Sequence, residues 1–387
     1  MAAGSAAQAV TLAVLEADPH PVLARLRAAA PVSWVPVLGA WLVTGYDEAV
    51  QVMRDARRFT VDDPRFSTAK VVGPSMLSLD GARHAHHRGP FTRPFRSDEI
   101  RARLASFIQA EADRLATAVE PRGHAELRRA VAGPLAAAVM AETLGLGQAD
   151  PARILRWYDG IVAAVQAEAA AGQGGPAAGP AGRAAFTDLA GRLHEVIAAR
   201  QASSLLAEVT GAGDRAAGAA GGVGAAPLTE AEAISNAAVL MFGGIETTEG
   251  MIANALLHLL SHPAELELIR SDHELIPAAI EESLRLEPAA AVVDRYATAD
   301  AEFAGATIRG SRPGEVAYLT VVSSPGWSAL FPHSPCSVVP VSQLACPCRR
   351  LTSLTWFRDK RQRGEGSPTA QAAGPLARRW RLSRHRN

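Results

Sequence analysis

The longest helical pattern in this 387-residue chain runs from Leu228 to Pro263, "LTEAEAISNAAVLMFGGIETTEGMIANALLHLLSHP". It opens with Thr229 and Glu232, the residue pair of a capping box, and Leu228 is placed to pack on the first turn. Apolar residues then recur at helical spacing as far as Leu259. About thirty residues rising 1.5 Å each form a rod of roughly 45 Å. A helix of that length crosses a whole domain, so the rest of the chain has to pack around it.

The remaining chain mixes short strands with helices. "VSWVPVLGAWLVTG" alternates as a hairpin that turns at Leu38 and Gly39. "DEAVQVMRD" predicts a helix with Asp47 as its N-cap, and the pattern from 98 to 146 is helical almost throughout. Two stretches rich in Ala and Gly, 167–185 and 210–227, are interpreted as loops.

Composition favours a globular protein, because 48% of the residues are hydrophobic and 20% are charged. The first twenty residues lack a basic start, and Glu16 and Asp18 interrupt their apolar stretch, so we predict no signal peptide. No window approaches 18 uninterrupted apolar residues, and we therefore expect a cytoplasmic protein that does not contact a membrane. The residues after Cys348 are basic but lack interleaved aromatic residues and a binding fold, so we expect no nucleic acid partner.

The middle of the long helix carries "GGIETTEG". Gly243 and Gly244 in a helix interior cost on the order of 2 kcal/mol relative to alanine, and Glu246 and Thr247 follow them within an apolar run. One interpretation is a kink where another helix crosses, with Glu246 in solvent. The other is a local widening beside a buried carboxylate and hydroxyl, which suits a small ligand and proton delivery. The acid and the alcohol directly after the glycines favour the second interpretation.

Three other segments accompany this motif in a fixed order. "LSLDGARHAHHRGPFTRPF" contains His84 and Arg88, "AAIEESLRLEP" contains Glu282 and Arg285, and "AVVDRYATADAEFAGATIRG" contains Arg295. Together with "FGGIETTEG" they resemble the bacterial cytochromes P-450, the haem-thiolate monooxygenases. The resemblance implies that Glu282 and Arg285 form a buried pair with a structural role on the cysteine side of the haem.

The resemblance covers roughly residues 15–319. It implies a mainly α fold with small β-sheets, the cytochrome P-450 fold, in a domain spanning 1–319. The C-terminal part is aberrant: residues 320–387 do not follow the family pattern, and we expect them to form a poorly ordered tail.

The resemblance also implies haem b as cofactor. Haem carries two propionates, which need fixed cations, and His84, Arg88 and Arg295 are the expected partners. The neighbouring His86 and His87 are interpreted as a solvated helix face.

Further roles follow for the long helix. The resemblance implies that Gly243 and Gly244 lie at the cofactor and that Glu246 and Thr247 relay protons to dioxygen. Thr248 is interpreted as a helix-packing residue.

All three cysteines lie late in the chain: Cys336, Cys346 and Cys348. In the family a cysteine thiolate binds the haem iron from a loop of the form Phe-x-x-Gly-x-x-x-Cys-x-Gly, expected near position 350. Cys346 and Cys348 are near this position, but their flanking residues lack the Phe and both glycines. Three interpretations remain: a haem ligand with degenerate flanks, a zinc site that would need four ligands, or a change of reading frame in the gene near residues 310–325. We assign no metal ligand.

These observations predict a haem-dependent monooxygenase that oxidises a small apolar molecule, such as a natural-product intermediate, inactive if the haem thiolate is missing. Its partners would be dioxygen, a ferredoxin-type electron donor and the small-molecule substrate. The alternative is a haem-free relative that activates a glycosyltransferase, as some family members that lack the cysteine do. A non-functional product of a damaged gene is the third possibility.

Overall fold

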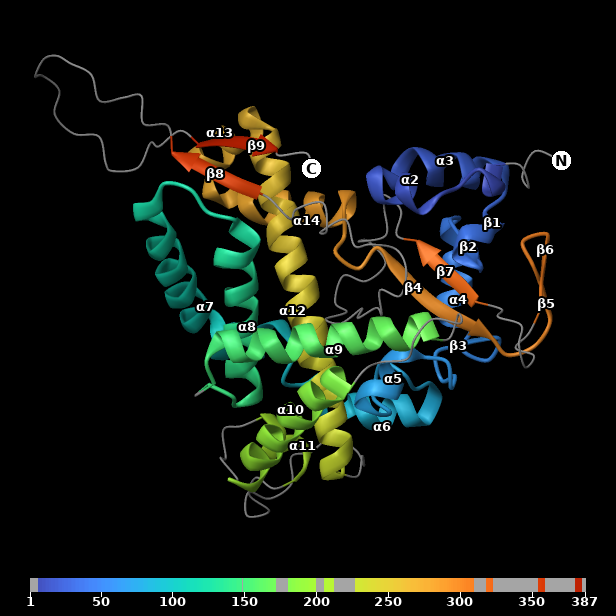
Figure 1. Ribbon diagram of the computed structural model, residues 1–387, viewed down its shortest axis with the longest axis horizontal. Helices are drawn as coiled ribbons and strands as arrows, with labels where there is room; N and C mark the ends of the chain where they lie inside the picture. Colours follow the sequence, from blue (N-terminus) through green and yellow to red (C-terminus); the bar gives the residue numbers. More distant parts are fainter. Residues whose placement is uncertain are drawn as a thin grey trace, which may run out of the picture.

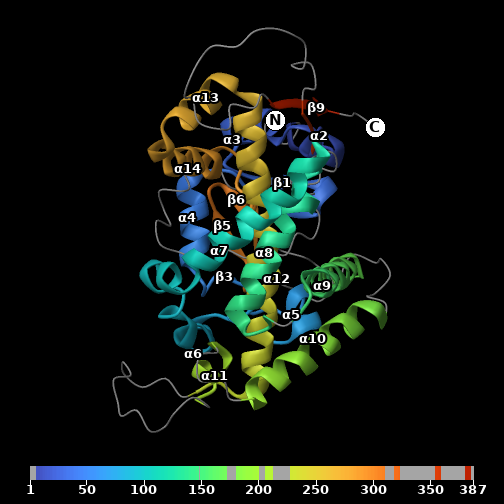
Figure 2. The same cartoon turned by 90° about the vertical axis from the view of Figure 1, so that its left-hand side faces the viewer.

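A computed structural model describes residues 6–147, 149–171, 180–199, 205–211, 227–309, 318–322, 354–358 and 380–384. The long helix α12 (Glu230–Ser261) runs through the molecule from end to end (Figures 1 and 2). Its 32 residues are helical without interruption, through both glycines. The predicted capping box is confirmed: the Glu232 backbone N–H donates to Thr229 Oγ1, and the Thr229 N–H donates to the Glu232 carboxylate.

Three helices build the main hydrophobic core against α12. They are α8 (Gly133–Leu144), α9 (Pro151–Ala171) and α10 (Pro180–Ala198). α9 crosses α12 near its middle, and α8 runs beside α12 (Figures 1 and 2). Helix α8 is formed almost entirely of small and apolar residues, so it packs closely and most of its residues are buried.

A five-stranded sheet lies beside the helical part, in the order β1-β2-β7-β4-β3. The predicted hairpin is confirmed, since β1 and β2 pair antiparallel and Gly39 takes the left-handed conformation at the turn, with φ of 58°. β7 pairs parallel with β2 and antiparallel with β4. It therefore connects the N-terminal hairpin, β1 and β2, with β4 in one sheet. The strands are β1 (Val32–Val35), β2 (Ala40–Val43), β3 (Phe59–Thr60), β4 (Val292–Ala297) and β7 (Tyr318–Val322).

The other elements surround these two parts (Figure 1). The remaining helices are α2 (Leu12–Ala17), α3 (Pro19–Ala29), α4 (Tyr46–Arg54), α5 (Ser67–Val72), α6 (Gly81–Thr92), α7 (Ser97–Val119), α11 (Leu205–Val209), α13 (Pro263–Ser271) and α14 (Ile276–Leu286). Short helical turns are η1 (Pro36–Leu38), η2 (Glu120–Arg122), the π-helical η3 (Arg128–Ala132) and η4 (His273–Leu275). Two more strand pairs are β5 (Ala301–Phe303) with β6 (Ala306–Ile308), and β8 (Leu354–Arg358) with β9 (Trp380–Arg384).

The mainly α fold with small sheets is confirmed, and two local predictions are wrong. The N-cap of α4 is Gly45, and Asp47 lies inside the first turn, where its charge still favours the helix. The stretch 167–185 is not a loop throughout, because α9 continues to Ala171 and α10 begins at Pro180. Alanine has the highest helix propensity, residues 167–171 contain no glycine, and Gly182 is the single glycine of residues 180–185.

Some predictions lie outside the described residues: the centre of the first Ala/Gly-rich stretch, most of the second, the three cysteines, and most of the segment after 319. The domain boundary at 319 therefore stays a prediction. Among the described helices none is long and apolar enough to cross a membrane.

Candidate haem and oxygen site

The predicted acid–alcohol pair lies at the middle of α12. Thr247 Oγ1 donates a hydrogen bond to the carbonyl of Gly243 at 2.6 Å, one turn earlier in the same helix. Both Glu246 and Thr247 are half-buried. Thr248 is exposed, so its predicted role in helix packing is wrong. One residue further along a helix turns the side chain by about 100°, which carries Thr248 away from the face that Thr247 uses.

Glu246 faces helix α9. Burial is the main cause that raises the pKa of Tyr158, and the negative charges of Glu246 and Glu249 raise it further. Tyr158 therefore lies close to both carboxylates, on the side of α12 that α9 covers. The Tyr158 ring also packs at 6.1 Å, between ring centroids, from Phe242 of α12.

The glycine before this pair allows a close approach between helices. A Cβ atom on Gly244 would collide with the sulfur of Met140, which projects from α8. Met140 is itself buried, so α8 and α12 touch at the predicted cofactor glycine. The close packing of α8 against α12 therefore also explains the glycine at position 244.

The sequence reasoning missed Glu249, a buried acid three residues after Glu246. Its Oε1 lies 2.8 Å from Nε of Arg128, and the Glu249 side chain is only 4% exposed. Burial raises the pKa of Glu249, and Arg128 partly offsets the shift. A Cβ on Gly133 would come within 3.2 Å of Glu249 Oε1, so this glycine makes room for the carboxylate. The sequence did carry a signal for Glu249, since it is an acid three positions after Glu246 within an apolar run.

The predicted propionate partner on the sheet, Arg295, is half-buried in β4. Its Nη1 donates to the backbone carbonyl of Asp294 at 2.7 Å. Burial lowers the pKa of Arg295, and the negative charges of Asp80 and Asp294 act in the opposite direction. Asp80 directly precedes α6, so Arg295 lies near the start of the helix that carries the other two predicted partners.

Those partners, His84 and Arg88, are one turn apart on α6 and both are half-buried. His84 Nδ1 lies 3.2 Å from the carbonyl oxygen of Leu79. A carbonyl only accepts, so Nδ1 carries a proton and Nε2 remains for another partner. Within the described part of the chain, neither Arg88 nor Arg295 forms an ion pair with an acidic side chain. These cations fit the two carboxylates of a haem.

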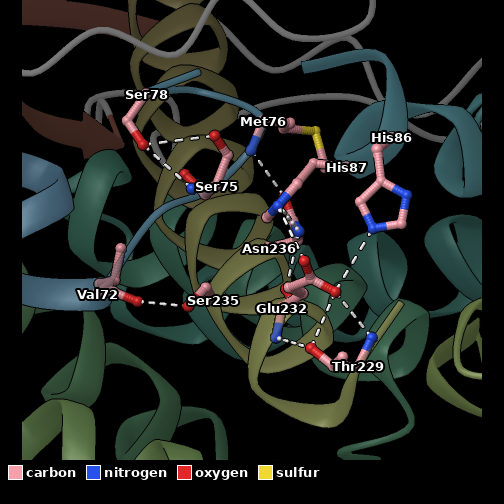
Figure 3. A network of polar contacts seen from close by, with 10 residues as sticks. All are labelled: Val72, Ser75, Met76, Ser78, His86, His87, Thr229, Glu232, Ser235 and Asn236. Atoms are coloured by element: carbon pink, nitrogen blue, oxygen red, sulfur yellow. Dashed lines mark hydrogen bonds and ion pairs between the residues drawn. The ribbon is translucent and has the colours of Figure 1, made fainter. Parts of the chain in front are cut away.

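The histidines between them do not form a solvated face as predicted. His87 is only 5% exposed, whereas His86 is half-buried. Nδ1 of His87 lies 2.9 Å from the side-chain nitrogen of Asn236, a fully buried residue of α12 (Figure 3). The prediction is wrong because α6 packs its His87 side against the first turns of α12.

Glu282 and Arg285 pair as predicted but at the surface of α14. Arg285 Nη2 lies 2.5 Å from Glu282 Oε1, and the side chains are 36% and 60% exposed, respectively. The expected burial of this pair is therefore not observed. The buried side of α14 is instead Ser283, whose hydroxyl lies 3.0 Å from Nδ1 of His258 on α12.

No three His, Cys, Asp or Glu side chains within the described ranges are arranged to hold a metal ion. Cys346 and Cys348 lie outside those ranges, so the iron ligand stays a question of sequence alone.

Comparison with known proteins identifies the family. No protein-family model matches the chain. The chain is 31% identical to cytochrome P450 monooxygenase PikC of Streptomyces venezuelae over 70% of its own length and 63% of PikC. It is 30% identical to pentalenic acid synthase of Streptomyces avermitilis, covering 76% of this chain and 71% of that protein.

A solved structure agrees with these sequence matches. The ligand-free structure of cytochrome P450 TbtJ1 aligns with a TM-score of 0.64 at 27% identity, over 79% of this chain and 74% of that one. The chain spans slightly less than two thirds of the length of PikC. The matches in sequence, fold and ordered motifs agree: the chain belongs to the cytochrome P450 family, and its relatives imply haem as the cofactor.

Proposed function

We propose that this protein is a haem-dependent monooxygenase that oxidises a small apolar molecule of secondary metabolism. One atom of dioxygen enters a C–H bond of the substrate, and the other leaves as water after taking up two protons. The two electrons required come from a ferredoxin-type donor. Relatives named as oxygenating enzymes of this kind, such as PikC and mycinamicin IV hydroxylase/epoxidase of Micromonospora griseorubida, support the class of reaction.

Residues of two elements would hold the cofactor. Arg88 and His84 of α6 and Arg295 of β4 would bind the haem propionates through charge-assisted hydrogen bonds. Bound haem supplies the activation of dioxygen. Thr247 holds a proton at Oγ1, 2.6 Å from the Gly243 carbonyl, and Glu246 beside it can exchange protons from the α9 side.

The observation that carries this proposal is the guanidinium of Arg295, a half-buried residue of β4. Burial lowers its pKa, so the charge is held in the folded chain at a free-energy cost. The hydrogen bond that Arg295 Nη1 donates to Asp294 uses a neutral carbonyl. Asp80 and Asp294 offset part of this cost, and an anionic ligand would offset more of it when it binds.

A matched pair of variants tests this role. Arg295→Met should lower haem affinity about tenfold or more, because hydrogen bonds to charged groups contribute about 1.5–3 kcal/mol. The same variant should leave the haem-free protein as stable as before, or more stable, since a costly buried charge is removed. Haem titration and urea unfolding of the haem-free protein measure the two quantities.

Arg65→Met is the control. Arg65 pairs with Asp63 at 2.7 Å and stacks on the Tyr296 ring, so its loss should weaken the fold and spare haem affinity. If Arg295→Met instead destabilises the haem-free protein and leaves haem affinity unchanged, Arg295 is a structural residue and the proposal loses its support.

The unrecognised cysteine loop keeps a second candidate open, the haem-free activator of a glycosyltransferase. A purified chain that binds no haem and raises the activity of such a transferase would favour it.

A further inference from the structure

A buried polar network joins three segments that are far apart in sequence. It connects the segment between α5 and α6, residues 73–80, to the first turns of α12 and to α6 (Figure 3). Asn236 is its centre and is fully buried. Ser235, the residue before it, donates a hydrogen bond to the Val72 carbonyl at 2.7 Å. Asn236 therefore holds Met76 of the segment 73–80 on α12, and Ser235 holds Val72, the last residue of α5, directly before that segment.

Two partners fix which way the Asn236 amide faces. The backbone N–H of Met76 is a donor, so the oxygen Oδ1, at 2.8 Å, must face it. The backbone carbonyl of Glu232 is an acceptor, so Nδ2, at 2.7 Å, must face that side. Turning the amide over would oppose donor to donor and acceptor to acceptor, and both bonds would be lost.

This orientation dictates the protonation of His87. Nδ2 of Asn236, a donor, lies 2.9 Å from His87 Nδ1, so Nδ1 must be an unprotonated acceptor. The single ring proton of neutral His87 then sits on Nε2, which points towards Glu232 Oε1 at 3.5 Å. A second proton would have to enter at Nδ1, directly against the Asn236 N–H. Protonated His87 is thus incompatible with the bond that holds Met76.

The groups around His87 oppose one another. Glu232 of α12 favours its charged form, whereas Arg83 and His86 of α6 disfavour it. Burial is the largest influence and lowers the pKa of His87 below its ordinary value. A cavity of about 450 Å³, lined by Pro74, Arg83, His86, His87, Glu232 and Ser235, adjoins the ring. Water and protons therefore have a route to the histidine.

We propose that Asn236 and His87 are positioning residues that latch the segment 73–80 onto α12 while His87 is neutral, and that uptake of one proton by His87 releases it. The consequence for catalysis rests on the proposed function: the family resemblance implies that residues 65–76, which overlap this segment at 73–76, shape the substrate side of the haem pocket. Acidification would then loosen this side of the haem pocket without changing the protonation of a catalytic residue. Substrate affinity, and not the proton relay at Thr247, is the property that the latch controls.

Amide hydrogen exchange of the full chain tests the latch, with the Met76 amide as the probe. In the wild type its protection factor should fall about tenfold per pH unit below about pH 6.5, since opening is coupled to one proton. His87→Asn retains an acceptor at the Nδ1 position but does not titrate, so protection should stay high and independent of pH. Asn236→Leu should lower protection at every pH.

His86→Asn is the matched control, because His86 also faces Glu232, at 3.5 Å, yet makes no bond to Asn236. It should follow the wild type. A wild type without pH dependence, or a His87→Asn variant that retains it, overturns the latch. The exchange measurement needs neither haem nor substrate. Its outcome is therefore independent of whether the protein is a monooxygenase, and the tests of the proposed function do not depend on the latch.

Discussion

Arg128 Nε lies 2.8 Å from Glu249 Oε1, across the contact between the π-helical turn η3 and the middle of α12. The two side chains are 19% and 4% exposed, so the pair is largely removed from water. Buried charges are stable only when paired, and removing one partner leaves the other uncompensated. This ion pair therefore fixes the half of α12 that carries Glu246 and Thr247.

Arg128→Met should reduce the free energy of unfolding by about 3–5 kcal/mol, because it leaves the Glu249 carboxylate buried without its partner. The double variant Arg128→Met/Glu249→Met should recover most of this loss, since no charge remains. Urea unfolding measures both. Arg114→Met, which breaks an exposed pair with Glu111, should change little. Equal losses in the single and double variants would show that packing, rather than charge, decides stability there.

Gly244→Ala should destabilise the protein despite the better helix propensity of alanine. Overpacking against Met140 costs about 1–3 kcal/mol, whereas alanine in place of glycine contributes about 1 kcal/mol. Because shortening Met140 removes the clash, Gly244→Ala/Met140→Ala should lose less stability than the sum of the two single variants. Gly191→Ala in α10, where a Cβ meets nothing within 4 Å, should be stabilising. Thermal unfolding reports all of these, and a stabilising Gly244→Ala would refute the close contact.

Thr247→Val keeps the branched shape of the side chain and removes its hydroxyl. If Oγ1 delivers protons, the rate of substrate oxidation should fall on the order of 10²-fold, with haem affinity unchanged. Thr248→Val, at the exposed neighbour, should be nearly neutral. Product formation by the reconstituted enzyme is the measurement, and a fully active Thr247→Val variant would exclude this role.

The capping box predicts a pH dependence in acid. The backbone N–H of Thr229 is the main cause that lowers the pKa of Glu232 below 4.5. The folded state therefore favours the ionised carboxylate: its contribution is present above pH 4.5 and is lost as pH falls through the lowered pKa. Glu232→Gln should flatten the stability profile on the acid side in urea unfolding from about pH 3 to 6. An unchanged profile would assign the acid sensitivity to other carboxylates.

The sequence predicted most accurately the features that depend on residues close together in the chain. The capping box joins Thr229 and Glu232, three positions apart, and the hairpin turn depends on Gly39 alone. The burial of His87 depends on Asn236, 149 residues later, and could not be seen locally.

The same limit applies to the missed ion pair. Glu249 was visible as an acid in an apolar run, but its partner Arg128 lies on a separate element, within a run of two arginines that looks like a solvated surface. The site residues were found through their motifs. Packing between helices decides which of these residues are buried. It leaves Glu282 and Arg285 at the surface of α14.

The proposed function requires that this chain carries a thiolate-bound haem, and one spectrum tests that requirement most directly. The full chain, reconstituted with haem, reduced and exposed to carbon monoxide, should retain one haem per chain. Its main absorption band should lie at the position typical of cysteine-thiolate ligation. A protein that retains no haem, or whose carbon monoxide complex absorbs where histidine-bound haem does, would contradict the account.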